Sequence, residues 1–239
     1  MTTLENKVAF VTGGSKGIGY GVAAALSSKG VKVAITSRHI DEAEDAAKEI
    51  SKHGKGEVIG IEADVRDFKS QERALQEVTQ KWGKLDVLVA NAGVGHFGSI
   101  EELTAEQWQQ TIDTNLTGVF FSLKAAVPYL KESKGYIFTI SSLAGTNFFA
   151  GGTAYNASKF GVTGFTQAAM LDLRDHDIKV TTIMPGSVAT HFNDHQPSEA
   201  DSWKIQIEDI GELVVDLLKM NHRALPSKVE IRPTKPPKK

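Results

Sequence analysis

The sequence contains no cysteine, and this absence excludes several kinds of site. A disulfide framework, thiol catalysis, an iron–sulfur cluster and a cysteine-ligated zinc site all require residues that the chain lacks. The seven histidines include no His-Glu-x-x-His or similar spacing, so we expect no metal site.

The sequence also lacks an excess of one charge and any long apolar run. Its 27 Lys and Arg residues against 29 Asp and Glu give a formal net charge of -2, which argues against a nucleic-acid binder. No uninterrupted apolar run approaches the roughly 18 residues of a membrane helix, and residues 1–7 lack the pattern of a signal peptide. We therefore expect a soluble, cytoplasmic protein that binds neither membranes nor nucleic acid.

Short apolar, β-branched runs recur along the chain and alternate with segments of helical spacing. The expected strands lie at 8–11, 31–36, 58–61, 85–90, 136–140, 180–184 and, more weakly, 229–231. Apolar runs without alternation suit strands that are covered on both faces. The pattern predicts an α/β fold, a three-layer, doubly wound parallel sheet (Rossmann fold) of about seven strands. No linker interrupts it, so we expect one domain over residues 1–232 and a flexible tail over the proline- and lysine-rich residues 233–239.

A glycine-rich turn, Thr-Gly-Gly-Ser-Lys-Gly-Ile-Gly at 12–19, follows the first expected strand directly. Glycine permits positive φ and a close approach of backbone to a ligand. A helix that starts there presents free N–H groups and a positive dipole end, to which a pyrophosphate binds. Tight turns also need glycine, but the place of this turn in the first strand–helix unit favours dinucleotide binding. The candidate cofactor residues are Gly13, Ser15, Lys16, Gly17, Ile18 and Gly19.

The end of the second strand indicates which dinucleotide is bound. A protein that binds NAD usually has an acid about 20 residues past the glycine turn, whereas this chain has Ser37 and Arg38. Arg38 and Lys16 suit a 2′-phosphate, so we expect NADP(H); the alternative is that both are solvated surface charges. Asp64 and Val65 are a candidate adenine-binding pair by spacing, although Asp64 could equally cap a loop.

Tyr155 and Lys159 lie four residues apart at the start of a helical pattern, and therefore share one helix face. A nearby ammonium lowers the pKa of a tyrosine and makes the phenol a usable acid or base. A surface tyrosine beside a solvated lysine is the alternative. The serines Ser141-Ser142 and the small, backbone-rich turn at 91–93 follow expected strands at the sheet edge where open α/β sheets bind ligands.

Four elements, in this order and spacing, resemble the short-chain dehydrogenase/reductase family in its compact single-domain form. They are the glycine turn at 12–19, the Asn-Ala-Gly segment at 91–93, Ser142, and Tyr155 with Lys159. Asn115 and the Pro-Gly pair at 185–186 extend the resemblance, which covers residues 5 to about 220.

The resemblance implies a role for each matched residue. Tyr155 is the general acid in carbonyl reduction and the base in alcohol oxidation, and Lys159 lowers its pKa and contacts the nicotinamide ribose. Ser142 orients and polarises the carbonyl, and Asn115 helps to hold a water in a proton relay. The residues implied to contact the cofactor beyond the glycine turn are Asn91, Ala92, Gly93, Tyr155, Lys159, Pro185, Gly186, Val188 and Thr190.

The function implied is an NADPH-dependent oxidoreductase that interconverts a carbonyl and an alcohol. One alternative is a 3-oxoacyl-(acyl-carrier-protein) reductase, although such enzymes commonly end in a Val-Asp-Gly-Gly type segment that is absent at 229–233. Another is a catalytically silent NADP-binding regulatory protein, whose mark would be a broken Ser/Tyr/Lys set. A lyase or epimerase usually needs further acid/base residues or a longer substrate domain.

Residues 191–208 are polar where many reductases of this family carry a long helical lid. We expect a short, mobile lid and an open pocket for small or polar carbonyls, with promiscuity equally possible. Pocket candidates, which could equally be packed or solvated, are His96, Phe97, Phe148, Phe149 and Phe192. Apolar residues at 120–123 and 160–170 exceed what one sheet face needs, so we expect a homodimer or homotetramer, as in family members.

Overall fold

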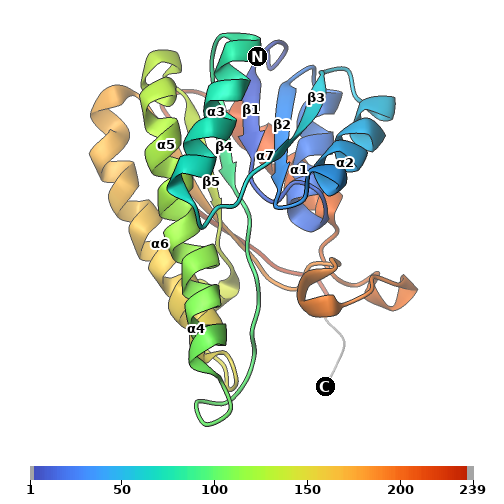
Figure 1. Cartoon of the computed structure of the whole chain (residues 1–239), viewed down its shortest axis with the longest axis vertical. Helices are drawn as coiled ribbons and strands as arrows, with labels where there is room; N and C mark the ends of the chain where they lie inside the picture. The colour runs from blue at the N-terminus through green and yellow to red at the C-terminus, as the bar shows by residue number, and fades with distance from the viewer. Residues whose placement is uncertain (1–2, 236–239) are drawn as a thin grey trace.

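The computed structural model describes residues 3–235 and contains one parallel sheet in the order β3-β2-β1-β4-β5-β6-β7 (Figure 1). The last four residues of the expected tail, 236–239, lie outside the described residues. The strands are β1 (Val8–Val11), β2 (Lys32–Ser37), β3 (Val58–Glu62), β4 (Val87–Ala90), β5 (Tyr136–Ile140), β6 (Lys179–Pro185) and β7 (Lys228–Ile231). Each begins and ends within two residues of its expected position.

Helices cover both faces of the sheet, so the predicted three-layer α/β fold is confirmed (Figure 1). One face packs against α1 (Gly17–Ser28), α2 (Ile40–His53) and α7 (Ile207–Lys219). The other packs against α3 (Phe68–Trp82), α5 (Gly118–Ser133) and α6 (Thr153–Leu173). A shorter helix, α4 (Ala105–Ile112), continues through a π-helical turn at Asp113–Thr117 into α5. None of the helices in the described part of the chain is long and apolar enough to cross a membrane.

The central strands are buried on both faces, as their unbroken apolar sequences predict. All residues of β1, β4 and β5 are buried. Phe10, Leu88 and Ile137 stand in register across these three strands and belong to the core beneath α3, α5 and α6. Burial of such side chains contributes about 1.5–3 kcal/mol each relative to exposure.

The strand order reverses direction between β1 and β4. The chain builds outward from β1 to β3 and then returns to pair β4 with the other side of β1. Ligands of open α/β sheets bind in the crevice outside the carboxyl ends of the strands at such a switch point. This topology places the glycine turn after β1 beside the Asn91 segment after β4.

Candidate active site

The glycine turn lets two loops approach closely at the carboxyl edge of the sheet. Gly13 and Gly17 adopt positive φ values of 63° and 60°. A Cβ at Gly13 would lie 2.9 Å from the Cα of Ala92, and one at Gly19 would overlap the Gly13 carbonyl oxygen. These positions leave bare backbone for a ligand.

The first turn of α1 has amides that no side chain caps. Lys16 is the N-cap residue, and its side chain makes no capping hydrogen bond. Gly17 and Ile18, which open the helix, line the adjacent cleft. Uncapped N–H groups at a helix start bind anions such as a pyrophosphate, so this cradle fits a dinucleotide.

Asn91 joins the glycine turn to the end of β4. Its Nδ2 donates hydrogen bonds of 2.9 Å to the carbonyl oxygens of Thr12 and Gly13. The Thr12 hydroxyl oxygen accepts from the Asn91 and Ala92 amides at 3.0 and 3.1 Å. Asn91 thus fixes the shape of the cradle through its side chain.

A cleft of about 1200 Å³ connects these elements. With the exceptions of Gly19 and Asn115, every residue expected to bind cofactor or to act in catalysis lines it. Gly19 is itself buried in α1, and a Cβ there would overlap the Gly13 carbonyl oxygen and the Asn91 Nδ2, so only glycine lets these groups approach the helix.

A carboxylate that the sequence argument missed stands beside the expected 2′-phosphate residues. The Ser37 hydroxyl donates a 2.7 Å hydrogen bond to Glu42, and both residues line the cleft with the exposed Arg38. Ser37 and Glu42 are close in sequence, but the hydrophobic periodicity of the chain does not predict the contact between their side chains. Glu42 opposes the attraction of Arg38 and Lys16 for an anion.

Asp64 is held by an arginine two residues away. Arg66 donates to both carboxylate oxygens of Asp64, with an Nη2–Oδ2 distance of 2.6 Å. This hydrogen bonding holds the pKa of Asp64 below its usual range. Val65 is buried next to it and also lines the cleft.

Tyr155 and Lys159 lie on the first turns of α6 and reach the end of β5. The Lys159 Nζ donates a 2.9 Å hydrogen bond to the Ile140 carbonyl and lies 5.7 Å from the centroid of the Tyr155 ring. Burial raises the pKa of Tyr155, and a hydrogen bond with the Ser142 side chain opposes this. Burial also lowers the pKa of Lys159 to about 8. The expected lowering of the Tyr155 pKa by Lys159 is therefore wrong for the protein alone, because burial dominates.

The two serines after β5 point in different directions. Ser141 is buried, and its hydroxyl bonds to the Lys159 carbonyl oxygen and the Thr163 hydroxyl within α6. The Ser142 hydroxyl oxygen accepts from the Ala144 amide at 3.1 Å, and Ser142 lines the cleft together with Tyr155. Ser142, the serine at the family spacing, is the one whose side chain acts to lower the pKa of the phenol.

Asn115 sits in the π-helical turn and is fully buried. Its Oδ1 accepts from the Val94 amide at 2.8 Å, and its Nδ2 donates to the Val94 carbonyl and the Ser158 hydroxyl at 2.8 and 3.1 Å. In this structure Asn115 joins the loop after β4 to α6. Single π-helical turns inside helices are frequent at functional sites.

Among the expected pocket residues, His96 does not line the cleft. Its Nε2 lies 2.9 Å from the Gln110 Oε1, so the ring turns toward α4 instead. The expectation that His96 lines the pocket is therefore not met, because its ring bonds to Gln110 instead. The four phenylalanines do line the cleft: Phe97, Phe148, Phe149 and Phe192.

The segment after β6 carries its own hydrogen-bond network around the buried Asp201. Its carboxylate pairs with His195 and Lys204 at 2.6 Å each and accepts from the Ser198 amide at 3.1 Å. Lys204 and, second, His195 hold the pKa of Asp201 well below its usual range. His195 and Lys204 also line the cleft, so these contacts with Asp201 stabilise the expected lid segment, residues 191–208, beside the site.

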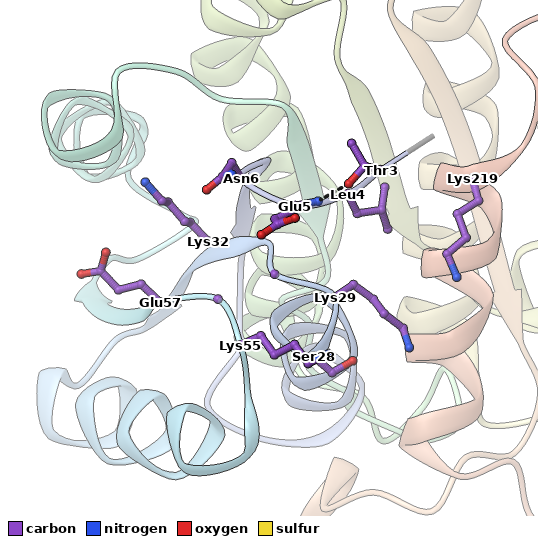
Figure 2. A pocket seen from close by; sticks show the side chains of 12 residues that line it. Thr3, Leu4, Glu5, Asn6, Ser28, Lys29, Lys32, Lys55, Glu57 and Lys219 are labelled. Carbon is purple, nitrogen blue, oxygen red and sulfur yellow. Dashed lines mark hydrogen bonds between the residues drawn. The ribbon is translucent and has the colours of Figure 1, made fainter. Parts of the chain in front are cut away.

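A second hollow of about 520 Å³ lies at the opposite edge of the sheet, before β1, β2 and β3 (Figure 2). Its charged side chains, shown in the figure, are Glu5, Lys29, Lys32, Lys55, Glu57 and Lys219. It contains none of the residues expected to bind cofactor or substrate.

The chain is similar in sequence and in fold to known oxidoreductases. The chain is 38% identical over 192 residues to a trans-4-hydroxycyclohexanecarboxylate dehydrogenase of Sinomonas cyclohexanicum, covering 78% of this chain and 74% of that protein. It is 37% identical over 201 residues to a 3-oxoacyl-[acyl-carrier-protein] reductase of Synechocystis, covering 83% and 81%. Its fold matches that of an alcohol dehydrogenase from Thermococcus sibiricus complexed with 5-hydroxy-NADP, with a TM-score of 0.91, 30% identity and coverage of 98% and 99%.

A family model described as short chain dehydrogenase matches residues 7–201. The match spans the glycine turn, the Asn91 segment, Ser142, Tyr155 and Lys159. The chain therefore belongs to the short-chain dehydrogenase family.

Proposed function

We propose that the protein is an NADPH-dependent oxidoreductase that reduces a ketone or aldehyde to an alcohol, or catalyses the reverse. The observation that carries this proposal is the meeting of Ser142, Tyr155 and Lys159 in one cleft with the glycine cradle. A protein that only bound a dinucleotide would have no need of the acid and hydroxyl at this place.

The chemistry needs a proton donor and a group that stabilises the developing oxyanion. When bound, the reduced nicotinamide supplies a hydride, with its two electrons, to the carbonyl carbon. Tyr155 gives its phenolic proton to the carbonyl oxygen, and the Ser142 hydroxyl donates a hydrogen bond to the same oxygen. The products are the alcohol and NADP⁺, and Tyr155 regains a proton from solvent. Below about pH 8 the Lys159 ammonium is charged. It therefore stabilises the phenolate that exists after Tyr155 has given up its proton and before it regains one.

The preference for NADP(H) rests on Arg38, which follows β2, and on Lys16, the N-cap residue of α1. Both line the cleft and carry the positive charge that a 2′-phosphate requires. The 5-hydroxy-NADP complex of the Thermococcus sibiricus enzyme supports the same choice. Glu42 weakens this preference without supplying the acid at the strand end that is usual for NAD.

A 3-oxoacyl-(acyl-carrier-protein) reductase is the second candidate, supported by the similarity to the Synechocystis enzyme. The two candidate functions share the cofactor and the proton donor. They differ in the substrate that occupies the outer part of the cleft, which is a ketone or aldehyde in one case and an acyl thioester in the other. An acetoacetyl thioester therefore distinguishes them from each other.

The test is to follow NADPH absorbance against ketones, aldehydes, sugars and acetoacetyl thioesters. Consumption with at least one of these supports the proposal. Tight NADPH binding without consumption on any of them would instead favour a catalytically silent binder.

A further inference from the structure

Four aromatic side chains, Phe97, Phe149, Phe192 and Tyr155, form a continuous aromatic wall in the cleft. Phe97 is central, with its ring centroid 5.3 Å from Tyr155, 6.1 Å from Phe149 and 6.4 Å from Phe192. Phe192 also lies 5.7 Å from Tyr155. These separations are typical of interacting rings. A substituent on a carbonyl that Tyr155 protonates therefore lies against this wall.

The wall presents uncovered apolar surface inside a concave site. Phe97, Phe149 and Phe192 are 43%, 48% and 37% exposed. Contiguous exposed apolar surface in a cleft marks a binding site, because a ligand that covers it removes that surface from water. The uncovered ring faces favour a flat apolar group over a polar one.

Two glycines, Gly95 and Gly152, leave the space that the rings of the wall occupy. A Cβ at Gly95 would lie 2.5 Å from Phe192 Cε1 and 2.9 Å from Phe97 Cε2. A Cβ at Gly152 would lie 2.7 Å from Phe149 Cε2. Any larger residue at 95 or 152 would push a ring out of the wall, so the rings fit the backbone beneath them.

Hydrogen bonds also fix the loops that carry the rings. The buried Asn156 donates to the Ala144 and Asn147 carbonyls at 2.8 Å each and accepts from the Phe149 amide at 3.3 Å. The Gly98 amide donates to the Gly151 carbonyl at 2.9 Å and joins the Phe97 loop to the Phe149 loop. A preorganised wall loses little conformational entropy when a ligand binds.

The lysine and the arginine on the lid side of the cleft already have acidic partners. Lys204 pairs with Asp201 at 2.6 Å, and Arg232 pairs with Glu230 at 2.8 Å. A substrate with a carboxylate beside its carbonyl would have to compete for these cations. The charges therefore agree with the exposed rings in favouring an uncharged, apolar substituent.

We propose that the substrate carries a flat apolar group, such as an aryl ring, next to the reacting carbonyl, and that Phe97 determines this selectivity. The inference rests on the proposed function, because the wall selects a substituent only if Tyr155 acts on the carbonyl. It differs from the expectation of small or polar carbonyls, which came from the polar sequence at 191–208. Phe97 and Phe149 lie outside that segment.

The experiment compares kcat/KM with NADPH for acetophenone, cyclohexyl methyl ketone and acetone. Wild-type protein is expected to favour acetophenone over its saturated analogue by about fivefold, the scale of ring–ring contacts. Phe97→Leu keeps an apolar side chain and is expected to remove this ratio, because kcat/KM for acetophenone falls more than kcat/KM for acetone. Phe97→Tyr keeps the ring and retains the ratio. Phe68→Leu, the same change on α3 outside the cleft, serves as the matched control.

Two kinds of result distinguish a failure of the proposed selectivity from a failure of the proposed function. Equal kcat/KM for acetophenone and cyclohexyl methyl ketone in wild-type protein, or an equal fall for all three ketones in Phe97→Leu, overturns the selectivity while carbonyl reduction stands. Retained NADPH binding with no turnover of any carbonyl overturns the proposed function itself. If Phe97→Leu loses NADPH binding or its cooperative melting, Phe192→Leu tests the same wall.

Discussion

The Lys159 ammonium donates a 2.9 Å hydrogen bond to the Ile140 carbonyl and lies 5.7 Å from the centroid of the Tyr155 ring. The last residue of β5 thus anchors the side chain that stands beside the phenol. Burial lowers the pKa of Lys159 to about 8 and raises the pKa of Tyr155. At neutral pH Tyr155 therefore holds its proton and Lys159 is charged, which is the state that carbonyl reduction requires.

Tyr155→Phe removes the proposed proton donor and keeps the ring in the aromatic wall. We expect turnover to fall by about 10²–10⁴-fold, the usual scale for loss of a general acid, with the Kd for NADPH nearly unchanged. Steady-state kinetics and a fluorescence titration measure the two quantities. Near-normal turnover would refute the assignment of Tyr155.

Lys159→Met tests the burial of the ammonium in the protein without nucleotide. The pKa of Lys159 is about 8 in the folded chain and 10.5 for an ordinary lysine. Between these values the unfolded chain binds a proton that the folded chain has lost, so the free energy of unfolding rises with pH. Below about pH 8 both states are protonated and this contribution is absent.

We therefore expect the difference in unfolding free energy between wild type and Lys159→Met to grow in favour of wild type from about pH 8 to 10. Urea unfolding at several pH values measures it. Lys69→Met, at an exposed position on α3, is the control and should keep the wild-type slope. Parallel pH profiles for wild type and Lys159→Met would contradict a lowered pKa.

The sequence predicts those features of this molecule that depend on neighbours along the chain. The central strands were placed correctly because their runs are almost wholly apolar, and the glycine turn because its residues are consecutive. The sequence does not predict contacts between distant loops. Phe97 contacts Phe149 and Phe192, which lie on two other loops, and no sequence periodicity predicts the course of these loops. His96, adjacent to Phe97, turns away to Gln110 for the same reason. The direction of the Tyr155 pKa shift also needed the structure, because burial is a tertiary property.

Arg38→Ala tests the choice of cofactor. Loss of this cation is expected to weaken NADPH binding about tenfold and leave NADH binding unchanged, because only NADPH carries the 2′-phosphate. Glu42→Gln removes the opposing carboxylate and is expected to strengthen NADPH binding. Both are measured as Kd values at one fixed ionic strength. Arg223→Ala, an exposed arginine outside the cleft, should change neither Kd. Wild-type protein that binds NADH as tightly as NADPH would contradict the preference.

Asp201→Asn tests whether the lid depends on the carboxylate that pairs with His195 and Lys204. The variant keeps the size of the side chain and loses its charge, so we expect faster hydrogen exchange at residues 195–205 and a raised KM with a smaller change in kcat. Because the folded pKa of Asp201 is depressed, its contribution to stability exists above about pH 4 and disappears as the pH falls. Asp216→Asn, at an exposed site on α7, should leave the exchange of the lid unchanged. Unaltered exchange in Asp201→Asn would show that other contacts hold the lid.

Self-association is expected through the outer face of α6, which Figure 1 shows at the edge of the molecule. Phe160 and Leu171 are 43% and 53% exposed, and their separation of eleven residues puts them on one side of the helix. Gly164 lies between them, and a Cβ there would meet nothing within 4 Å, which leaves room for the close approach of a second helix. Such an apolar stripe is stable in water when a second copy covers it.

Phe160→Glu with Leu171→Glu places two charges on this stripe and is expected to give a monomer at micromolar concentration, whereas wild-type protein gives a dimer or tetramer. Size-exclusion chromatography with light scattering distinguishes these masses. Leu225→Glu introduces the same kind of charge at a residue that is 37% exposed outside the α6 face, and should leave the mass unchanged. Phe160 and Leu171 lie on the side of α6 away from the sheet, so the double variant should still bind NADPH. Monomeric wild-type protein, or a double variant with the wild-type mass, would show that this stripe does not hold two copies together.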